Sequence, residues 1–301
     1  MSLVPFPFCL FPLTPRARYE VPLRNRAALV LGERTLVMGI LNITPDSFSD
    51  GGVRLDPARA IEDGLRMVEE GADILDVGGE STRPGAEPLP ADEELRRVLP
   101  VIERLATSGL PISIDTYKAI VAREAIAAGA VIVNDVSGLQ FDSDLGGVVA
   151  GSHAAVVLMH NRGRSREMYR EAAYTDVVAE ISEELAAAIG RATAAGVPRE
   201  AVIIDPGLGF AKRATHSYAA LAGLAKLAVL DRPILSGPSR KSFLTAATGD
   251  RPPARREWGT AAAVTASVLL GAHIVRVHRV AGMVDVARVA DRIRQEFSPD
   301  G

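Results

Sequence analysis

The stretch "EEGADILDVGG", residues 69–79, decides the fold because its pattern recurs later as "AAGAVIVNDVSG" (127–138) and "LLGAHIVRVH" (269–278). Each copy has a glycine suited to a helix C-terminus, then an alanine, then an apolar run rich in β-forming residues. Five residues after that glycine a polar side chain follows, namely Asp76, Asn134 and Arg276. The repeat therefore predicts a helix that leads into a buried strand with one polar position.

Looser copies of the apolar run extend this pattern over the chain, as "LVMGILN" (36–42), "PISIDT" (111–116), "AAVVLMHN" (154–161), "VIIDPGLG" (202–209) and "PILSGPSR" (233–240). Amphipathic stretches rich in Ala, Leu, Glu and Arg separate them. Continuously apolar strands that alternate with helices indicate a parallel sheet covered on both faces. Eight such units predict an α/β fold, a closed (β/α)8 TIM barrel. A doubly wound open sheet is the alternative, but the G-x-G-x-x-G turn typical of it is missing from the sequence.

The length of 301 residues suits one large domain, which we expect over residues 26–298. Within it, "AALVLGERTLVMG" (27–39) predicts a short N-terminal β-hairpin that covers the bottom of the barrel. Residues 1–25 are expected to be a flexible extension. Their apolar run follows no basic residue and is broken by prolines, so it does not resemble a secretion signal.

Composition excludes several classes of partner. The net charge of −3 provides no positive field for nucleic acid or for an anionic membrane, and no window is apolar for long enough to span a bilayer. The single cysteine, Cys9, excludes an internal disulfide and a cysteine-based zinc site. We therefore expect a cytoplasmic protein that binds neither nucleic acid nor membranes.

Polar residues at the carboxyl ends of barrel strands should converge on one pocket. These are Asn42, the 76–83 segment, Asp115, Asn134, His160, Asp205, Lys241, Arg276 and His278. Two carboxylates beside one amide, at Asp115, Asp205 and Asn134, suit a flat ligand with an edge of N–H donors. The alternative is that each aspartate caps the helix that follows it.

A cationic cluster is expected beside these acceptors. Arg276 and His278 are two residues apart on one strand and share a face, and Arg83 and Lys241 follow other strands. Phosphate or pyrophosphate would relieve their mutual repulsion, whereas surface salt bridges are the alternative. His160 closes a strand and is either an acid–base group or a packed histidine.

Several segments occur in the order of a known family: "GILNITPDSFSDGG" (39–52), "DVGGESTRPGAEP" (76–88), "SIDTYKA" (113–119), "VNDVSG" (133–138), "IDPGLGF" (204–210), "SGPSRKSFL" (236–244) and "RVH" (276–278). On these residues the sequence resembles dihydropteroate synthase, the pterin-binding enzyme of folate biosynthesis and a sulfonamide target. The resemblance covers the chain from about residue 36 to the last helix.

The resemblance implies the following site. The pterin would be bound by Asp115, Asn134, Val136, Met159, Asp205, Phe210, Gly237, Lys241 and Arg276. The pyrophosphate would be bound by Asn42, Thr82, Arg83, Arg276 and His278, with Asn42 as a ligand of Mg²⁺. The p-aminobenzoate would be bound by Phe48, Thr82, Pro84, Lys241 and Ser242, on loops that close over it. The catalytic residues would be Asp115, Lys241, Arg276 and His278.

The reaction implied is a condensation of 6-hydroxymethyl-7,8-dihydropterin diphosphate with p-aminobenzoate, through an SN1-like substitution in a homodimeric enzyme. Two alternatives are a catalytically silent pterin-binding homologue and a methyltransferase that passes a methyl group from a folate to a corrinoid. Three positions depart from the family pattern: Asn161 replaces a common methionine, Ala211 a usual glycine and Arg279 a usual aspartate.

Overall fold

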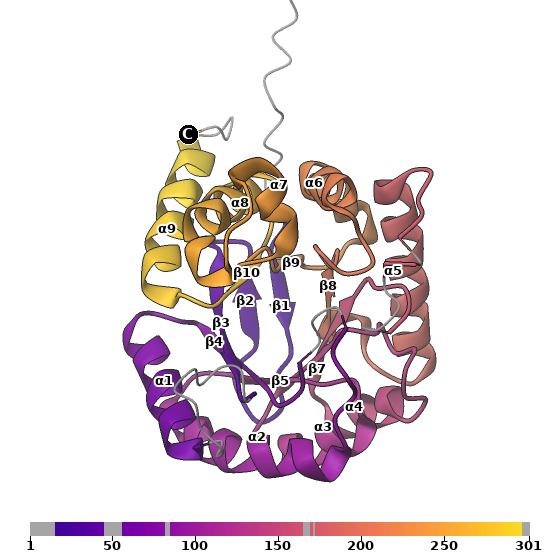
Figure 1. Ribbon diagram of the computed structural model, residues 1–301. Helices are drawn as coiled ribbons and strands as arrows, with labels where there is room; N and C mark the ends of the chain where they lie inside the picture. Colours follow the sequence, from indigo (N-terminus) through magenta and orange to yellow (C-terminus); the bar gives the residue numbers. More distant parts are fainter. Residues whose placement is uncertain (1–15, 45–55, 82–84, 165–168, 171, 297–301) are drawn as a thin grey trace, which may run out of the picture.

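The computed structural model describes residues 16–44, 56–81, 85–164, 169–170 and 172–296. Within them, eight parallel strands lie side by side in the order β8-β7-β6-β5-β4-β3-β10-β9 (Figure 1). Their bounds are β3 (Leu36–Asn42), β4 (Ile74–Gly78), β5 (Ile112–Asp115), β6 (Ile132–Asp135), β7 (Ala155–Met159), β8 (Val202–Asp205), β9 (Leu235–Ser236) and β10 (Ile274–Val277).

The two outer strands of this order, β8 and β9, meet just before β9 begins. Ile204 and Ile234 form a parallel bridge, and the Ile204 amide donates to the Pro233 carbonyl at 3.0 Å. This bridge closes the sheet on itself, so the predicted (β/α)8 barrel is confirmed.

Side chains alternate between the inside and the outside of the barrel along each strand. On β4, Ile74 packs in the cluster inside the barrel, whereas Leu75 and Val77 pack in the cluster beneath the helices. Asp76 therefore points inward, and Arg276 on β10 does so for the same reason. The inward position nearest the carboxyl end is polar on several strands, as at Asn42, Asp115 and Asp205, whereas β7 ends on Met159.

Helices surround the barrel (Figure 1), and their bounds are α1 (Pro57–Glu69), α2 (Ala91–Leu105), α3 (Ala119–Ala127), α4 (Leu145–Ser152), α5 (Val177–Ala194), α6 (Ala214–Ala222), α7 (Thr245–Thr248), α8 (Glu257–Leu269) and α9 (Val280–Glu296). Local signals fix some of these ends. Asp56 caps α1 by accepting from the Ala58 amide at 2.9 Å, and Pro57 occupies the first turn, where no donor is lost.

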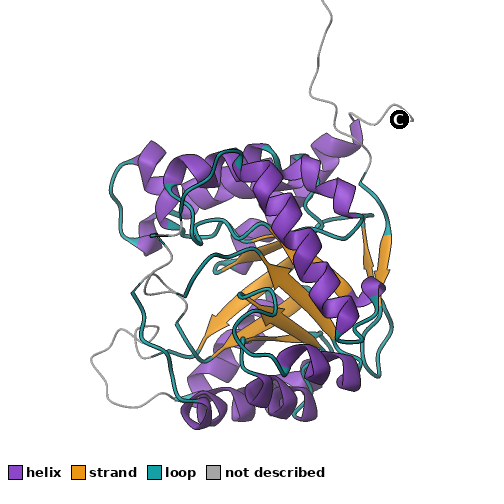
Figure 2. Ribbon diagram, turned by 90° about the vertical axis from the view of Figure 1, so that its right-hand side faces the viewer, coloured by secondary structure: helices purple, strands orange, loops and turns teal. Residues whose placement is uncertain are grey.

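The predicted N-terminal hairpin is present, but its strands differ from those expected. β1 (Tyr19–Val21) pairs antiparallel with β2 (Leu29–Leu31), whereas residues 36–39, expected as part of the hairpin, belong to β3. The reason is that β3 pairs on both edges, with β4 and β10, which leaves no edge for β2. The side chains of Val21, Leu23 and Leu31 pack on the apolar residues inside the barrel, and the hairpin stands at one end of it (Figure 2).

The described chain begins at Arg16, within the range 1–25 that the sequence assigned to a flexible extension, and Tyr19–Val21 of that range form β1. Residues 1–15 of the predicted extension lie outside the described residues. Among the described helices, none combines the length and the apolar character needed to cross a membrane.

Candidate active site

A cavity of about 480 Å³ opens at the carboxyl ends of the strands. Every residue that the resemblance assigns to the site, and that lies in the described part of the chain, lines it: Asn42, Asp115, Asn134, Val136, Met159, Asp205, Phe210, Gly237, Lys241, Ser242, Arg276 and His278. The other predicted residues, Phe48, Thr82, Arg83 and Pro84, lie outside the described residues. The structure thus brings the predicted strand-end groups together, while the role of each stays a prediction.

Arg276 links two carboxylates at the bottom of the cavity. Its Nε donates to Asp76 Oδ2 at 2.5 Å, and its Nη2 donates to Asp115 Oδ2 at 2.6 Å. Asp76 Oδ2 also accepts from Asn134 Nδ2 at 2.9 Å. These bonds fix the acidic and amide groups before any ligand arrives, because each is held by a charged or buried neighbour.

The second oxygen of Asp115 is available to a ligand. Asp115 Oδ1 is buried and has no hydrogen-bond partner among the described residues. Burial raises the pKa of the Asp115 carboxyl; Arg276 opposes that rise, and the nearby Asp76 adds to it. A ligand that donates an N–H to Oδ1 would favour the ionised carboxylate, so binding and ionisation of Asp115 would support each other.

Asp205 faces the cavity from the end of β8. Its Oδ1 accepts from the Gly207 amide at 2.7 Å, which orients the carboxylate at the start of the loop that follows. Burial raises the pKa of Asp205, and the bond from Gly207 and the charges of Lys241 and Arg276 oppose this rise. Asp205 thus stabilises the turn that follows β8. The alternative prediction, that this aspartate caps the following helix, holds only in that its carboxylate accepts from a backbone amide of the loop.

The cationic groups lie beside these acceptors. Lys241 Nζ lies 3.8 Å from the centroid of the Phe210 ring, a cation–π contact that holds the lysine at the cavity wall. His278 Nδ1 lies 2.9 Å from Ser239 Oγ, and the same hydroxyl oxygen accepts from the His278 amide at 3.2 Å. An anion at this side of the cavity would meet both cationic residues together with Arg276.

Asn42 is the one residue predicted to hold a metal. Its side-chain oxygen is a hard ligand of the kind that Mg²⁺ prefers, and Mg²⁺ commonly takes few protein ligands when substrate phosphates supply others. A Cβ added to Gly78 would lie 3.5 Å from Asn42 Oδ1, so the glycine keeps open the space beside that oxygen. Among the residues that the structure places, no three His, Cys, Asp or Glu side chains form a metal site. A single amide oxygen fits an ion whose other ligands come from a bound diphosphate and water.

His160 does not line the cavity. The packed histidine is the alternative that the structure favours: its ring is buried, and Nδ1 lies 2.7 Å from Lys212 Nζ. Burial, followed by the charge of Lys212, lowers the pKa of His160 to about 4, so the ring is neutral at pH 7. An acid–base role for His160 at the reacting centre is therefore contradicted by its position.

The departures from the family pattern have distinct local consequences. Ala211 has a φ of +45°, in the left-handed region where glycine is unstrained, and its carbonyl accepts from the Tyr174 hydroxyl at 2.9 Å. Asn161 is buried, and its Oδ1 has no partner among the described residues. Arg279 is exposed and does not line the cavity.

Sequence reasoning gave no individual role to several residues of the site. Asp76 shares the repeat position of Asn134 and Arg276, and this register could have identified it as a partner of both. Ser239 and Arg256 also contribute to the cavity. Arg256 precedes α8, far from any strand end, and the strand pattern contains no signal for it.

A larger hollow of about 730 Å³ lies outside the barrel, along α3 and α4. Its lining includes Arg24, Arg123 and His153, and none of the inward strand-end side chains reaches it. Size alone therefore does not identify the functional site; the convergence of buried carboxylates and cations does.

Comparisons with known proteins agree with this geometry. Residues 38–278 match the family described as pterin binding enzyme. The dihydropteroate synthase of Mycobacterium leprae is 50% identical over 259 residues, which are 84% of this chain and 91% of that protein. The dihydropteroate synthase of Xanthomonas albilineans with 4-aminobenzoic acid is 44% identical, with a TM-score of 0.83 over 91% of this chain and 98% of that one. Its complex with 7,8-dihydropteroate is 41% identical, with a TM-score of 0.80 over 91% of this chain and 99% of that one.

Proposed function

The chain belongs to the pterin-binding enzyme family, as a dihydropteroate synthase, and we propose that it performs its reaction by a magnesium-assisted dissociative substitution. The enzyme is a transferase of folate biosynthesis. It joins 6-hydroxymethyl-7,8-dihydropterin diphosphate to p-aminobenzoate and releases 7,8-dihydropteroate and pyrophosphate. The observation that carries the mechanism is the placement of Asp115, Asn134 and Asp205 in one cavity with Lys241, Arg276 and His278.

The acceptor groups suit the pterin ring. A pterin presents ring and amino N–H donors along one edge, and a carboxylate with a free oxygen can accept from them. Asp115 Oδ1 has no other partner among the described residues, and Asp205 and Asn134 face the same cavity. Val136, Met159 and Phe210 form a small apolar cluster there, which offers flat apolar contact to the ring faces.

The bond changes need no protein nucleophile. The bond between the pterin methylene carbon and the diphosphate oxygen breaks, and its electron pair goes to the diphosphate. The p-aminobenzoate nitrogen then donates its lone pair to the methylene carbon and loses a proton to solvent. Asp115 and Asp205 stabilise the positive charge that develops on the pterin, while Arg276, His278 and Lys241 stabilise the negative charge on the leaving group.

Magnesium is part of the proposal, with Asn42 as the protein ligand and the diphosphate oxygens as further ligands. When bound, the ion would offset the charge of the diphosphate as it leaves. The p-aminobenzoate site includes Lys241 and Ser242 at the cavity wall. Its other predicted residues, Phe48, Thr82 and Pro84, lie outside the described part of the chain, so closure of those loops over the second substrate stays a prediction.

A homodimer and a cytoplasmic location also belong to the proposal. Support for the dimer comes from α8 and α9, where Trp258 is 85% exposed and Val289 and Ile293 are exposed as well. Apolar side chains on two neighbouring helices are the kind of surface that a second copy would cover. Trp258→Glu should therefore convert a dimer, measured by sedimentation, into a monomer.

The function is tested by following pyrophosphate release from the pterin diphosphate with and without p-aminobenzoate. We expect release that depends on both substrates, and a fall of about 10²- to 10³-fold in kcat/KM for Lys241→Ala and for Asp205→Ala. Lys226→Ala and Asp250→Ala remove the same charges from exposed positions and should leave the rate unchanged.

Both alternatives predict a result in this assay that differs from that of a synthase. A catalytically silent homologue would bind the pterin and release no pyrophosphate. A methyltransferase acting on a corrinoid would likewise release none, because its substrate carries no diphosphate. A covalent enzyme–pterin adduct trapped in the absence of p-aminobenzoate would contradict the dissociative mechanism.

A further inference from the structure

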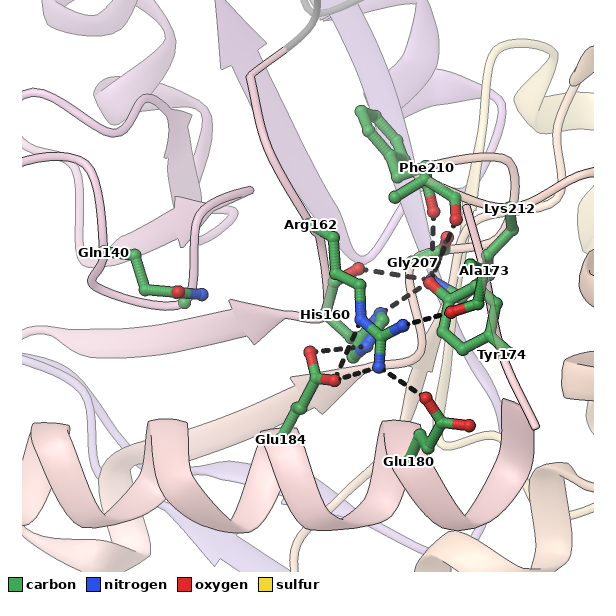
Figure 3. A network of polar contacts seen from close by, with 12 residues as sticks. Gln140, His160, Arg162, Ala173, Tyr174, Glu180, Glu184, Gly207, Phe210 and Lys212 are labelled. Carbon is green, nitrogen blue, oxygen red and sulfur yellow. Dashed lines mark hydrogen bonds and ion pairs between the residues drawn. The ribbon is translucent and has the colours of Figure 1, made fainter. Parts of the chain in front are cut away.

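A buried lysine lies behind the wall of the cavity and takes no part in the mechanism above. Lys212 is 2% exposed and lies in the loop between β8 and α6. Its Nζ donates to the carbonyls of Gly207, at 3.1 Å, and Phe210, at 3.0 Å, and lies 2.7 Å from His160 Nδ1 (Figure 3). An ammonium in such a place is costly to bury, so its retention calls for a role.

The loop that Lys212 holds forms one wall of the pterin cavity. Gly207, Gly209 and Phe210 line the cavity, and Gly207 donates its amide to Asp205. Gly207 has a φ of +66°, and a Cβ there would lie 2.0 Å from the His160 carbonyl oxygen, so the loop lies tightly against the end of β7. Lys212 thus binds the carbonyl side of a loop whose other side faces the ligand.

The same lysine is connected to α5 through His160. His160 Nε2 lies 3.2 Å from Glu184 Oε2, without a hydrogen bond between them in this geometry. Arg162 binds Glu184 and also Glu180, at 2.7 Å (Figure 3). Because the His160 ring is neutral, we assign its Nδ1 as the acceptor from Lys212 and its proton to Nε2. The His160 ring therefore lies between Lys212 and a helix outside the barrel.

Charged groups from several elements act on the Lys212 ammonium. They are Asp205 at the end of β8, Glu184 on α5, Arg162 after β7 and Lys241 after β9. Burial lowers the pKa of Lys212 to about 7, and Asp205 opposes that shift more than any other group. In return, the Lys212 charge helps to keep Asp205 ionised, which is the state that accepts from the ligand.

We propose that Lys212 is a positioning residue for pterin binding, which holds the Gly207–Phe210 loop and the Asp205 carboxylate in the shape that receives the ring. This rests on the proposed function, because it concerns the pterin side of that site. Lys212 does not contact the reacting atoms, so it sets the fraction of molecules that are ready to bind. When a smaller fraction of the molecules is ready to bind, the apparent Kd rises by the same factor by which that fraction falls. The chemical step of the bound complex stays unchanged.

The test compares Lys212→Met and Lys212→Gln with the wild type and with the exposed-lysine control Lys226→Met. Titration calorimetry measures the Kd of 6-hydroxymethyl-7,8-dihydropterin diphosphate without p-aminobenzoate, and the coupled assay measures kcat and both KM values. We expect Lys212→Met to raise the Kd about tenfold to a hundredfold, because two buried carbonyls lose their donor. Lys212→Gln, which keeps a shorter N–H donor, should raise it less.

The positioning role also predicts which kinetic constants the Lys212 variants leave unchanged. At saturating pterin diphosphate, kcat and the KM for p-aminobenzoate should remain within about twofold of the wild type. Adding Lys212→Met to an Asp205→Asn background should raise the Kd by a smaller factor than in the wild type, because the lysine acts partly through Asp205.

The outcomes separate the possible explanations. An unchanged Kd in a folded variant, or a fall in kcat as large as the fall in kcat/KM, would overturn the positioning role. If Lys212→Met does not fold, the folded Lys212→Gln variant decides by the same criteria; if neither folds, the lysine is structural and the proposal is wrong. Failure of the wild type itself to bind the pterin diphosphate would instead overturn the proposed function.

Discussion

Removal of the Asp76 carboxylate tests whether the acidic network at the bottom of the cavity is preorganised. Asp76 is fully buried on β4. In Asp76→Ala, Arg276 loses a bond of 2.5 Å and keeps its bond to Asp115, while Asn134 Nδ2 loses its acceptor. Loss of one partner of a buried ion pair typically costs about 3–5 kcal/mol. We expect the lower end, about 3 kcal/mol, because Asp115 still compensates the guanidinium.

Urea unfolding at pH 7.5 measures this cost, with Glu296→Ala as the matched control. Glu296 pairs with Arg292 on α9, where the two side chains are 64% and 73% exposed. Solvent screens that pair, so its loss should cost less than about 1 kcal/mol. The contrast between the two deletions isolates the effect of burial from the effect of removing a carboxylate.

A double-mutant cycle with Arg276→Met assigns the cost to the contact itself. We expect a coupling energy of about 1.5–3 kcal/mol, the range for hydrogen bonds to charged groups. A cost for Asp76→Ala below about 1 kcal/mol, or a coupling energy near zero, would refute the reasoning, because the three groups would then not act as one buried network.

Three further predictions concern other parts of the site. Ala211→Gly should change the free energy of unfolding by less than about 1 kcal/mol in urea melts, because relief of the left-handed φ of +45° offsets the lost methyl and the added chain entropy. Ala188→Gly, in the interior of α5, lacks that relief and should cost about 2 kcal/mol. The unfolded pKa of Lys212 is about 10.4 and the folded one about 7, so the unfolded chain binds more protons between these values. The stability of the wild type relative to Lys212→Met should therefore rise between pH 7 and 10, by up to about 1.4 kcal/mol per pH unit, and stay flat below pH 7. Asn42→Ala should weaken calorimetric binding of the pterin diphosphate in magnesium, yet leave binding of 6-hydroxymethylpterin, which has no diphosphate, unchanged.

The barrel was predictable from the sequence because buried strands and amphipathic helices leave different patterns. The repeat around Asp76, Asn134 and Arg276 predicted β4, β6 and β10, each with a polar position in a buried strand. The hairpin was predicted correctly as an element, but the strand that pairs with Leu29–Leu31 was assigned wrongly, because so short a strand can pair with either neighbour in sequence. Its true partner depends on β3 being taken up between β4 and β10, a tertiary effect that local sequence does not contain.

The gathering of site residues was predictable for the same reason, since strand ends meet at one end of a barrel. The role of Lys212 was not. It follows Phe210 by two residues, and nothing in its spacing indicates that its side chain turns back beneath its own loop. That direction depends on positive φ angles at Gly207, Gly209 and Ala211, of which only the two glycines leave a signal in the sequence.

The hydrogen bonds at Asp115 explain how a buried acidic site can bind a ring without first breaking its own ion pair. Arg276 holds Oδ2 at 2.6 Å, and Oδ1 has no partner among the described residues. The desolvation free energy of this carboxylate is therefore offset by Arg276 when the protein folds. A ligand then needs only to donate a hydrogen bond to the free oxygen. Arg276→Lys keeps the charge but cannot bond Asp76 and Asp115 in the same fixed fork. It should thus weaken pterin binding by at least about tenfold in calorimetry, and retained affinity would show that charge alone, without fixed geometry, is enough.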